Sequence, residues 1–178
     1  MMVIDWLQIG LAQRDLQDME GALEALERAV TANPTNPIAA FAYAQVRFET
    51  GRDTVAAFER ALHLDPANPQ LIRTYTAALA AEGEAERAQS ILLDTLAQHP
   101  QWLDGHKSLA TLRVAIGARE SFDESYRRAI AALPDSLSLR LAHIHLLSTA
   151  RAWEAARASV EAARQAFGPS RGLEVARV

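Results

Sequence analysis

Apolar and small residues recur along this chain at the spacing of an amphipathic helix. Residues 22–30, with the sequence ALEALERAV, place alanine, leucine and valine on one side of a helix and glutamate and arginine on the other. Residues three or four positions apart share one face of a helix, so such a segment buries one stripe and exposes the opposite side. The pattern predicts a set of amphipathic helices that pack against one another.

This helical pattern is periodic. Four prolines follow one another at spacings of 32, 34 and 34 residues, at Pro34, Pro66, Pro100 and Pro134. A small residue precedes each proline by five positions and a bulky apolar residue precedes it by eight; these residues are Ala29, Ala61, Thr95 and Ala129, and Leu26, Phe58, Leu92 and Tyr126. A fixed period of this length indicates a repeat architecture.

Each repeat also carries signals for where its helices begin and end. Asn36-Pro37 and Asn68-Pro69 are typical helix starts, with asparagine as the cap and proline in the first turn. Glycine interrupts the chain about fourteen residues into three of the units, at Gly51, Gly83 and Gly117. Glycine is favoured where one helix ends and the chain turns back. Each unit is therefore predicted to be helix, tight turn, helix and a loop that contains proline.

These residues resemble the tetratricopeptide repeat, a family with a 34-residue helical hairpin pattern. The first unit matches that pattern at Trp6, Ile9, Gly10, Ala22, Leu26, Ala29 and Pro34. The resemblance covers nearly the whole chain and implies an all-α, right-handed superhelical solenoid of about five repeats in one array. The expected repeats span approximately 3–36, 37–68, 69–102, 103–136 and 137–170, and residues 171–178 would begin a truncated sixth repeat.

Three places depart from the family pattern. The second unit is two residues short around residues 51–53, where we expect a tighter turn or a shortened helix and a local change in superhelical pitch. Phe122 occupies a position that normally holds alanine. Residues 171–178 look like a first helix that is cut short, so we expect the sequence to be part of a longer protein.

Composition narrows the function classes. Hydrophobic residues make up 49% of the chain, charged residues 22%, and the net charge is −4. These values are normal for a folded soluble protein and indicate no binding of nucleic acid or of an anionic membrane. There is no cysteine, which excludes disulfides and thiolate chemistry. Lys107 is the only lysine beside many arginines, a bias typical of bacterial proteins, and we expect a cytoplasmic location.

The histidines do not indicate an enzyme. His143 and His145 are two positions apart on a predicted helix, so they point about 200° away from each other and cannot share one metal ion. His63 and His99 lie near the ends of second helices, where a cation complements the helix dipole. His106 replaces the usual tryptophan of the fourth repeat and is expected to pack. The sequence contains no zinc-protease, phosphate-loop or serine-elbow motif, so we expect no catalytic residue, no cofactor and no metal.

The resemblance implies a concave face, lined by the first helices, that binds a protein or peptide partner. The candidate binding residues are Phe41, Gln45, Phe48, Arg73, Thr74, Lys107, Thr111, Leu141 and His145. For the two phenylalanines and the leucine the alternative is packing between helices, and for the two cations it is solvation. Chaperone-binding members of the family hold a terminal carboxylate with charge-assisted donors. The matching positions lack such donors here, so we expect no carboxylate clamp.

Two other functions stay open beside a free-standing interaction scaffold. Residues 102–106, 109–113 and 122–125 resemble the amino-terminal repeat arm of bacterial 2-oxoglutarate/iron(II) oxygenases. The single His-x-Asp sequence here, His63-Leu64-Asp65, lies at the end of a predicted second helix of the repeat, so a catalytic domain would lie beyond residue 178. Alternatively, acidic residues prevail in 1–34 and arginines in 137–178, which predicts weak, salt-sensitive self-association into a structural assembly.

Overall fold

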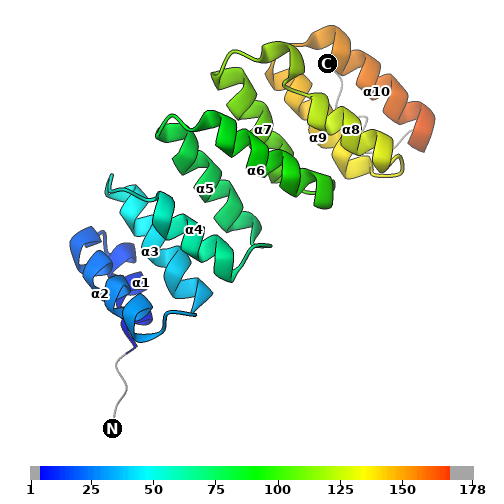
Figure 1. Cartoon of the computed structure of the whole chain (residues 1–178). Helices are drawn as coiled ribbons and strands as arrows, with labels where there is room; N and C mark the ends of the chain where they lie inside the picture. The colour runs from blue at the N-terminus through cyan, green and yellow to red at the C-terminus, as the bar shows by residue number, and fades with distance from the viewer. Residues whose placement is uncertain (1–4, 169–178) are drawn as a thin grey trace. The chain divides into compact units, whose positions relative to one another are not determined.

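The structure is a computed structural model that describes residues 5–168, which form ten α-helices and one short 3-10 helix (Figure 1). No β-strand occurs within this range, so the predicted all-α fold is confirmed. The chain divides into two compact units, residues 1–88 and residues 89–178, with the border inside the sixth α-helix. We call these parts unit 1 and unit 2.

Unit 1 is built from successive helical hairpins (Figure 1). Its helices are α1 (Trp6–Asp15), α2 (Met19–Ala32), α3 (Pro37–Glu49), α4 (Val55–Leu64), α5 (Pro69–Ala81) and the first turn of α6 (Ala85–Gln98). Within the hairpins α1 contacts α2 and α3 contacts α4, while α2 and α4 also contact the helix that follows each of them. The first helices α1, α3 and α5 are neighbours in space, and they form one layer of the unit.

Unit 2 continues the same pattern after the remainder of α6. It contains α7 (Leu103–Ala115), the 3-10 helix η1 (Arg119–Ser121), α8 (Glu124–Ala132), α9 (Leu137–Thr149) and α10 (Trp153–Phe167). Helices α7 and α9 are neighbours, and α8 and α10 pack against α9. Each unit thus contains a layer of first helices and a layer of second helices.

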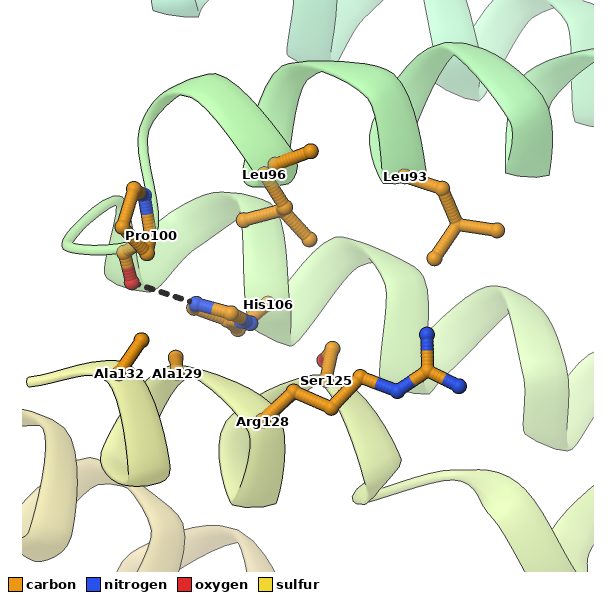
Figure 2. Close-up of a pocket in the computed structure, with 9 residues that line it drawn as sticks. Leu93, Leu96, Pro100, His106, Ser125, Arg128, Ala129 and Ala132 are labelled. Atoms are coloured by element: carbon orange, nitrogen blue, oxygen red, sulfur yellow. Dashed lines mark hydrogen bonds between the residues drawn. The ribbon is translucent and has the colours of Figure 1, made fainter.

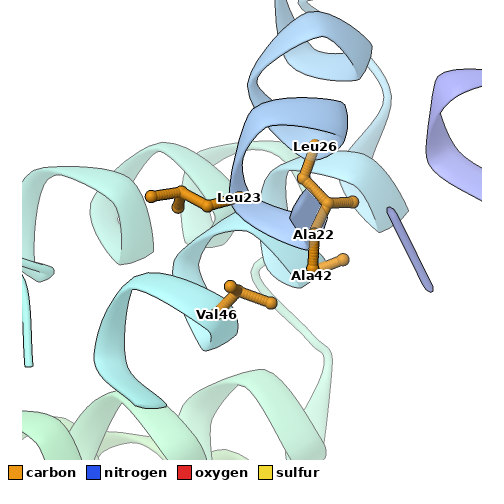
Figure 3. Packing of buried hydrophobic residues seen from close by; sticks show 5 residues of the cluster. All are labelled: Ala22, Leu23, Leu26, Ala42 and Val46. Carbon is orange, nitrogen blue, oxygen red and sulfur yellow. The ribbon is translucent and has the colours of Figure 1, made fainter. Parts of the chain in front are cut away.

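Small residues allow the helices of unit 1 to approach closely. Leu26 is fully buried and packs with Ala22 on α2 and with Ala42 and Val46 on α3 (Figure 3). A Cβ atom added to Gly10 of α1 would lie 2.6 Å from Cγ of Leu26, closer than side chains pack. Glycine at this position therefore lets α1 lie against α2.

The sequence signals for helix ends are confirmed. The side-chain oxygen of Asn36 accepts hydrogen bonds from the backbone N–H groups of Ile38 and Ala39, at 3.0 and 3.2 Å. Asn68 caps α5 in the same way. Gly51, Gly83 and Gly117 have φ values of 67°, 87° and 83°, in the left-handed region that glycine adopts without strain. Three turns between paired helices therefore follow from local sequence, whereas the α1–α2 and α9–α10 turns place Gln17 and Arg151 in the same region, at φ 63° and 59°.

The departures from the repeat pattern have structural counterparts. Helix α4 has 10 residues where α2 and α6 have 14, which confirms the shortened helix expected in the second repeat, at about residues 37–68. Ahead of α4, the fully buried Thr54 hydroxyl donates to the Glu82 carboxylate at 2.8 Å. Phe122 lies between η1 and the nine-residue α8, outside regular α-helix. The predicted sixth repeat at 171–178 lies outside the described residues, and the single array with its handedness and pitch stays a prediction.

Candidate functional site

Three of the predicted binding residues lie on one side of α3. Phe41, Gln45 and Phe48 are each half-buried, whereas Ala42 and Val46, on the other side of the helix, are buried in the core. The Phe48 ring meets the ring of Phe58 edge-on, with centroids 6.4 Å apart, so it takes part in packing between helices. The side-chain oxygen of Gln45 accepts a hydrogen bond from Nη1 of Arg14 on α1 at 3.3 Å.

Helix α5, beside α3, carries the next two predicted residues. Arg73 is exposed and donates to the side-chain oxygen of Gln70 at 2.8 Å. Thr74 is half-buried, and its hydroxyl donates to the Gln70 carbonyl at 2.8 Å. Both bonds stay within α5, and the partner that Arg73 contacts among the described residues is the neutral amide of Gln70.

Ile38 belongs to the same side of α3 and was missed by the sequence prediction. Its side chain is 64% exposed, unusual for an isoleucine, and it lies three positions before Phe41. The helical spacing from Phe41 was a signal for it. It lies in the first turn of α3, directly after Pro37, where the sequence alone does not show whether the preceding loop covers the side chain.

The four predicted residues of unit 2 are more polar and more exposed. Lys107 and Thr111 lie exposed on α7, and His145 lies exposed on α9. Leu141 is half-buried and packs against Ile144 and its core cluster, so it takes the packing role that was the alternative for this residue. The nine predicted residues therefore divide between two surfaces, five in unit 1 and four in unit 2.

Unit 2 also contains a stack of three rings that sequence reasoning did not foresee as a group. The rings of His106 and Tyr126 have centroids 4.7 Å apart, and those of Tyr126 and His143 are 5.6 Å apart. Nε2 of His143 lies 2.9 Å from a carboxylate oxygen of Asp123, just before α8. Burial raises the pKa of Tyr126 to about 12. The three rings lie on the separate helices α7, α8 and α9, about twenty residues apart along the chain, and no short sequence pattern marks them.

The predicted difference between the paired histidines of α9 is confirmed. His143 is buried and His145 is exposed, so the two side chains lie on different sides of the helix. Among residues 5–168, no group of three histidines or carboxylates lies together in a way that could hold a metal ion. Within the same range, none of the helices combines the length and the apolar character that crossing a membrane requires.

A cavity of about 220 Å³ lies in unit 2 where α6, α7 and α8 meet (Figure 2). Most of its lining is apolar, and two polar side chains and one cation join it; the lining residues are Leu93, Leu96, Ala97, Pro100, His106, Ser125, Arg128, Ala129 and Ala132. The Arg128 side chain is 74% exposed and pairs with the Glu124 carboxylate, so it lies at the mouth of the cavity.

Two buried polar atoms in this cavity have no hydrogen-bond partner. His106 is 1% exposed, and its Nε2 lies 2.8 Å from the Pro100 carbonyl, which can only accept; Nε2 therefore carries the proton. Burial lowers the pKa of His106, which keeps the ring neutral and leaves Nδ1 as a bare acceptor. Neither Nδ1 of His106 nor the hydroxyl of Ser125 has a partner. The predicted packing role of His106 is confirmed by its stacking on Tyr126.

Unit 1 has a pocket of about 300 Å³ at a related place. Four of its lining residues occupy the same repeat positions as four in unit 2: Val30 matches Leu96, Ala40 matches His106, Ala57 matches Ser125, and Arg60 matches Arg128. In unit 1, Arg60 donates to the carbonyls of Val30 and Pro34, at 3.3 and 3.0 Å. The polar pair of the unit 2 cavity is thus absent from the matched positions of unit 1.

Comparisons with known proteins agree with this architecture. Two tetratricopeptide repeat family models match the sequence, one over residues 7–69 and the other over residues 52–112. A comparison with curated proteins finds no significant match.

Several solved structures are similar to the chain. The MamA protein is 17% identical with a TM-score of 0.62, over 90% of this chain and 89% of that one. A thermophilic tetratricopeptide repeat protein of Thermus thermophilus is 22% identical with a TM-score of 0.57, over 96% of this chain and 94% of that one. The O-GlcNAc transferase of Thermobaculum terrenum is 21% identical with a TM-score of 0.53, over 64% of this chain and 23% of that one. At identities this low, the likeness concerns the fold.

Proposed function

The chain belongs to the tetratricopeptide repeat family, and we propose that it is a protein-interaction scaffold whose first helices bind an extended peptide or a partner helix. The binding surface of unit 1 would be the side of α3 and α5 that carries Phe41, Gln45, Phe48, Arg73 and Thr74. The surface of unit 2 would carry Lys107, Thr111 and His145, with Leu141 packed in the core cluster below it.

The observation that carries this proposal is the outward side of α3. Ile38, Phe41 and Phe48 lie along one side of the helix, and Ile38 is 64% exposed. Apolar groups at helical spacing are the usual anchors for an amphipathic or extended segment, because their burial on binding removes apolar area from water. The exposed isoleucine next to half-buried phenylalanines therefore supports this side of α3 as a docking surface.

Charge adds selectivity to the proposed surface. Arg73 on α5 lies beside α3 and makes its only described hydrogen bond to a neutral amide, which leaves its charge for a partner. Lys107 on α7 is also exposed. These cations favour a bound segment that combines apolar residues with aspartate or glutamate, since opposite charges raise the rate of encounter and reject basic segments.

The proposal can be tested by selecting ligands from a random peptide library. Selected peptides should combine apolar and acidic residues, and binding should slow amide hydrogen exchange in α3 and α5. The double variant Phe41→Ser, Arg73→Glu should weaken binding at least tenfold, which corresponds to about 1.4 kcal/mol. Arg157→Glu is the matched control, because Arg157 is an exposed arginine on the second helix α10. Equal affinity of the double variant and the control would remove this surface from the proposal.

A second candidate function is the repeat arm of a larger enzyme. The fold likeness to the Thermobaculum terrenum O-GlcNAc transferase, of which this chain covers 23%, favours it. An arm of the predicted 2-oxoglutarate/iron(II) oxygenase type is one form of this candidate. Sequencing the gene beyond codon 178 is the test: a β-helix domain with a His-x-Asp pair would support the oxygenase form, and a stop codon would exclude it. Self-association stays a prediction, for sedimentation at low salt to test.

A further inference from the structure

In unit 2, one glutamate bridges two arginines. An oxygen of the Glu124 carboxylate lies 3.4 Å from Nη1 of Arg113 on α7, and the other oxygen pairs with Nη2 of Arg128 on α8. Arg113 is only 7% exposed, and a buried cation needs a carboxylate because it has lost most of its hydration. Glu124 therefore neutralises a cationic place at the start of α8.

The repeat puts the same two arginines into unit 1. Equivalent positions differ by 66 residues on the first helices and by 68 on the second; Arg113, Glu124 and Arg128 correspond to Arg47, Ala56 and Arg60. A shared contact supports this match. Arg47 donates from Nε to the carbonyl of Asp53 at 2.7 Å. Arg113 donates from Nη1 to the carbonyl of Ser121, the equivalent residue, at 2.6 Å. In unit 1, alanine thus stands where unit 2 has the bridging glutamate.

Neutral oxygens hold the two arginines of unit 1 in place. Arg47 donates to a backbone carbonyl and to the Tyr43 hydroxyl, at 2.7 and 3.2 Å. Arg60 donates to two backbone carbonyls, at 3.3 and 3.0 Å, and both bonds come from Nη2. A guanidinium group carries five N–H donors, so Nη2 of Arg47 and Nε and Nη1 of Arg60 remain for another acceptor. These contacts orient both cations without neutralising them.

Both arginines line the pocket of about 300 Å³ between α2, α3 and α4, together with Ala56. Ala56 and Arg60 are exposed and Arg47 is half-buried, so a dissolved group can reach this place. The exposed Asp53 also lines the pocket, and the two arginines leave one net positive charge beside it. The apolar part of the lining consists of Val30, Ala40 and Ala57.

We propose that this pocket binds a carboxylate group, which pairs with Arg47 and Arg60 as the Glu124 carboxylate pairs with the matched arginines of unit 2. A carboxylate suits the place because its two oxygens can accept from two guanidinium groups at once. A small organic acid and a glutamate side chain of a partner protein present the same group. The site shares no residue with the proposed surface on α3 and α5, so either proposal can fail without the other.

The test compares butyrate with butanamide, which has nearly the same shape but no charge. Titration of the full chain at low salt, followed by NMR shifts of the arginine Nε–H groups and of α3 and α4 amides, should show saturable binding of butyrate. Butanamide should bind about tenfold more weakly, because ionised acceptors form the stronger hydrogen bonds with arginine. Equal affinity for the two compounds, or no saturable response of Arg47 and Arg60 to butyrate, overturns the proposal.

The contrast between the units supplies a direct competitor. Ala56→Glu restores the carboxylate that unit 2 has at the matched position, and it should weaken butyrate binding at least tenfold because the attached group occupies both arginines. Ala12→Glu, at an exposed position of α1, makes the same change in net charge and should leave butyrate binding nearly unchanged. Equal effects of the two variants would mean that butyrate responds to net charge alone, which contradicts the site.

Charge variants test the cations themselves. Arg60→Met should weaken butyrate binding about fivefold, since it removes a charge-assisted contact. Arg52→Met is the matched control in the same unit, because Arg52 already pairs with Glu20, and it should change little. Asp53→Asn should strengthen binding about twofold by removing a nearby negative charge. Circular dichroism checks that each variant keeps its helices. Unchanged affinity in Arg60→Met, or an equal loss in Arg52→Met, removes the assignment.

A further titration with a glutamate residue blocked at both ends, N-acetylglutamate α-amide, identifies the source of the carboxylate. Binding comparable to that of butyrate assigns the site to a glutamate side chain of a partner. Binding of butyrate alone assigns it to a small organic acid, because the pocket then rejects the attached backbone. Both results support the carboxylate site.

Discussion

The two units use the same repeat positions in different ways, and the clearest contrast is between Arg60 and Arg128. In unit 1, Arg60 reaches back to the carbonyls of Val30 and Pro34 and covers the end of α2. In unit 2 the matching carbonyl, that of Pro100, is bonded by His106, and Arg128 pairs with a glutamate of its own helix. The repeat determines the backbone position of each arginine, and the neighbouring residues determine which group its side chain binds.

The aromatic residues of the two units give a second contrast. Phe58 in unit 1 lies between Phe48 and Tyr75, with ring centroids 6.4 and 5.5 Å away. Tyr126 occupies the same repeat position in unit 2 and lies between two histidine rings. The ring stack around Phe58 thus combines two phenylalanines with one tyrosine, whereas the stack around Tyr126 contains two histidine rings. Mutations at matched positions test both contrasts.

The largest expected effect is the loss of the central ring of unit 1. Phe58→Ala removes a fully buried ring that contacts two other aromatic side chains, and should lower the free energy of unfolding by about 3–5 kcal/mol. Urea denaturation measures the total loss, and native-state hydrogen exchange should locate it in unit 1. Tyr126→Phe is the comparison in unit 2, and it should cost about 1 kcal/mol because only the hydroxyl is removed. Equal losses would contradict the packing described for Phe58.

The next effect concerns the close approach of α1 and α2. Gly10→Ala places a methyl group where Cγ of Leu26 lies 2.6 Å away, and should destabilise unit 1 by about 1–3 kcal/mol through overpacking. Thermal unfolding followed by circular dichroism measures the change. Ala12→Gly in the same helix is exposed and provides a control for helix propensity alone. A stabilised Gly10→Ala variant would mean that the two helices do not pack this closely.

Replacing the matched arginines Arg60 and Arg128 should lower the free energy of unfolding by smaller, unequal amounts. Arg60→Ala removes two hydrogen bonds to the end of α2 and should cost about 1 kcal/mol. Arg128→Ala removes an exposed ion pair within one helix and should cost about 0–0.5 kcal/mol. Denaturant titration of both variants in parallel is the measurement. A larger loss for Arg128→Ala would reverse the contrast between the units.

The smallest expected effect is the contribution of His106 to the loss of folding stability in acid. Burial lowers the pKa of His106 below 6.5, so below that pH the unfolded chain binds more protons than the folded one. Stability should therefore fall as the pH drops below about 6.5 and rise again as the pH returns to 7. The variant His106→Phe should lose less stability between pH 7.5 and pH 5 than the wild-type chain, as measured by urea denaturation. Identical pH profiles would mean that this ring is accessible to solvent.

Much of the fold was predictable because its signals are local. The asparagine caps, the glycine turns and the periodic buried residues each depend on a few neighbouring positions, and all three were confirmed. The candidate site was less predictable. Phe41 and Arg73 were correctly expected on the first helices, but the exposed Ile38 beside them was not, because periodicity marks apolar positions without telling which are covered.

By itself, the sequence determined the helices, their ends and the repeat family, since helical spacing and capping act over one or two turns. Only the tertiary structure decided that Asp123 pairs with His143, that Arg60 and Arg128 bind different groups, and that His106 and Ser125 share a cavity. Except for the pairing of Arg128 with Glu124 within α8, these arrangements join residues from separate repeat elements. They depend on the distances and rotations between packed helices, which local sequence patterns do not specify.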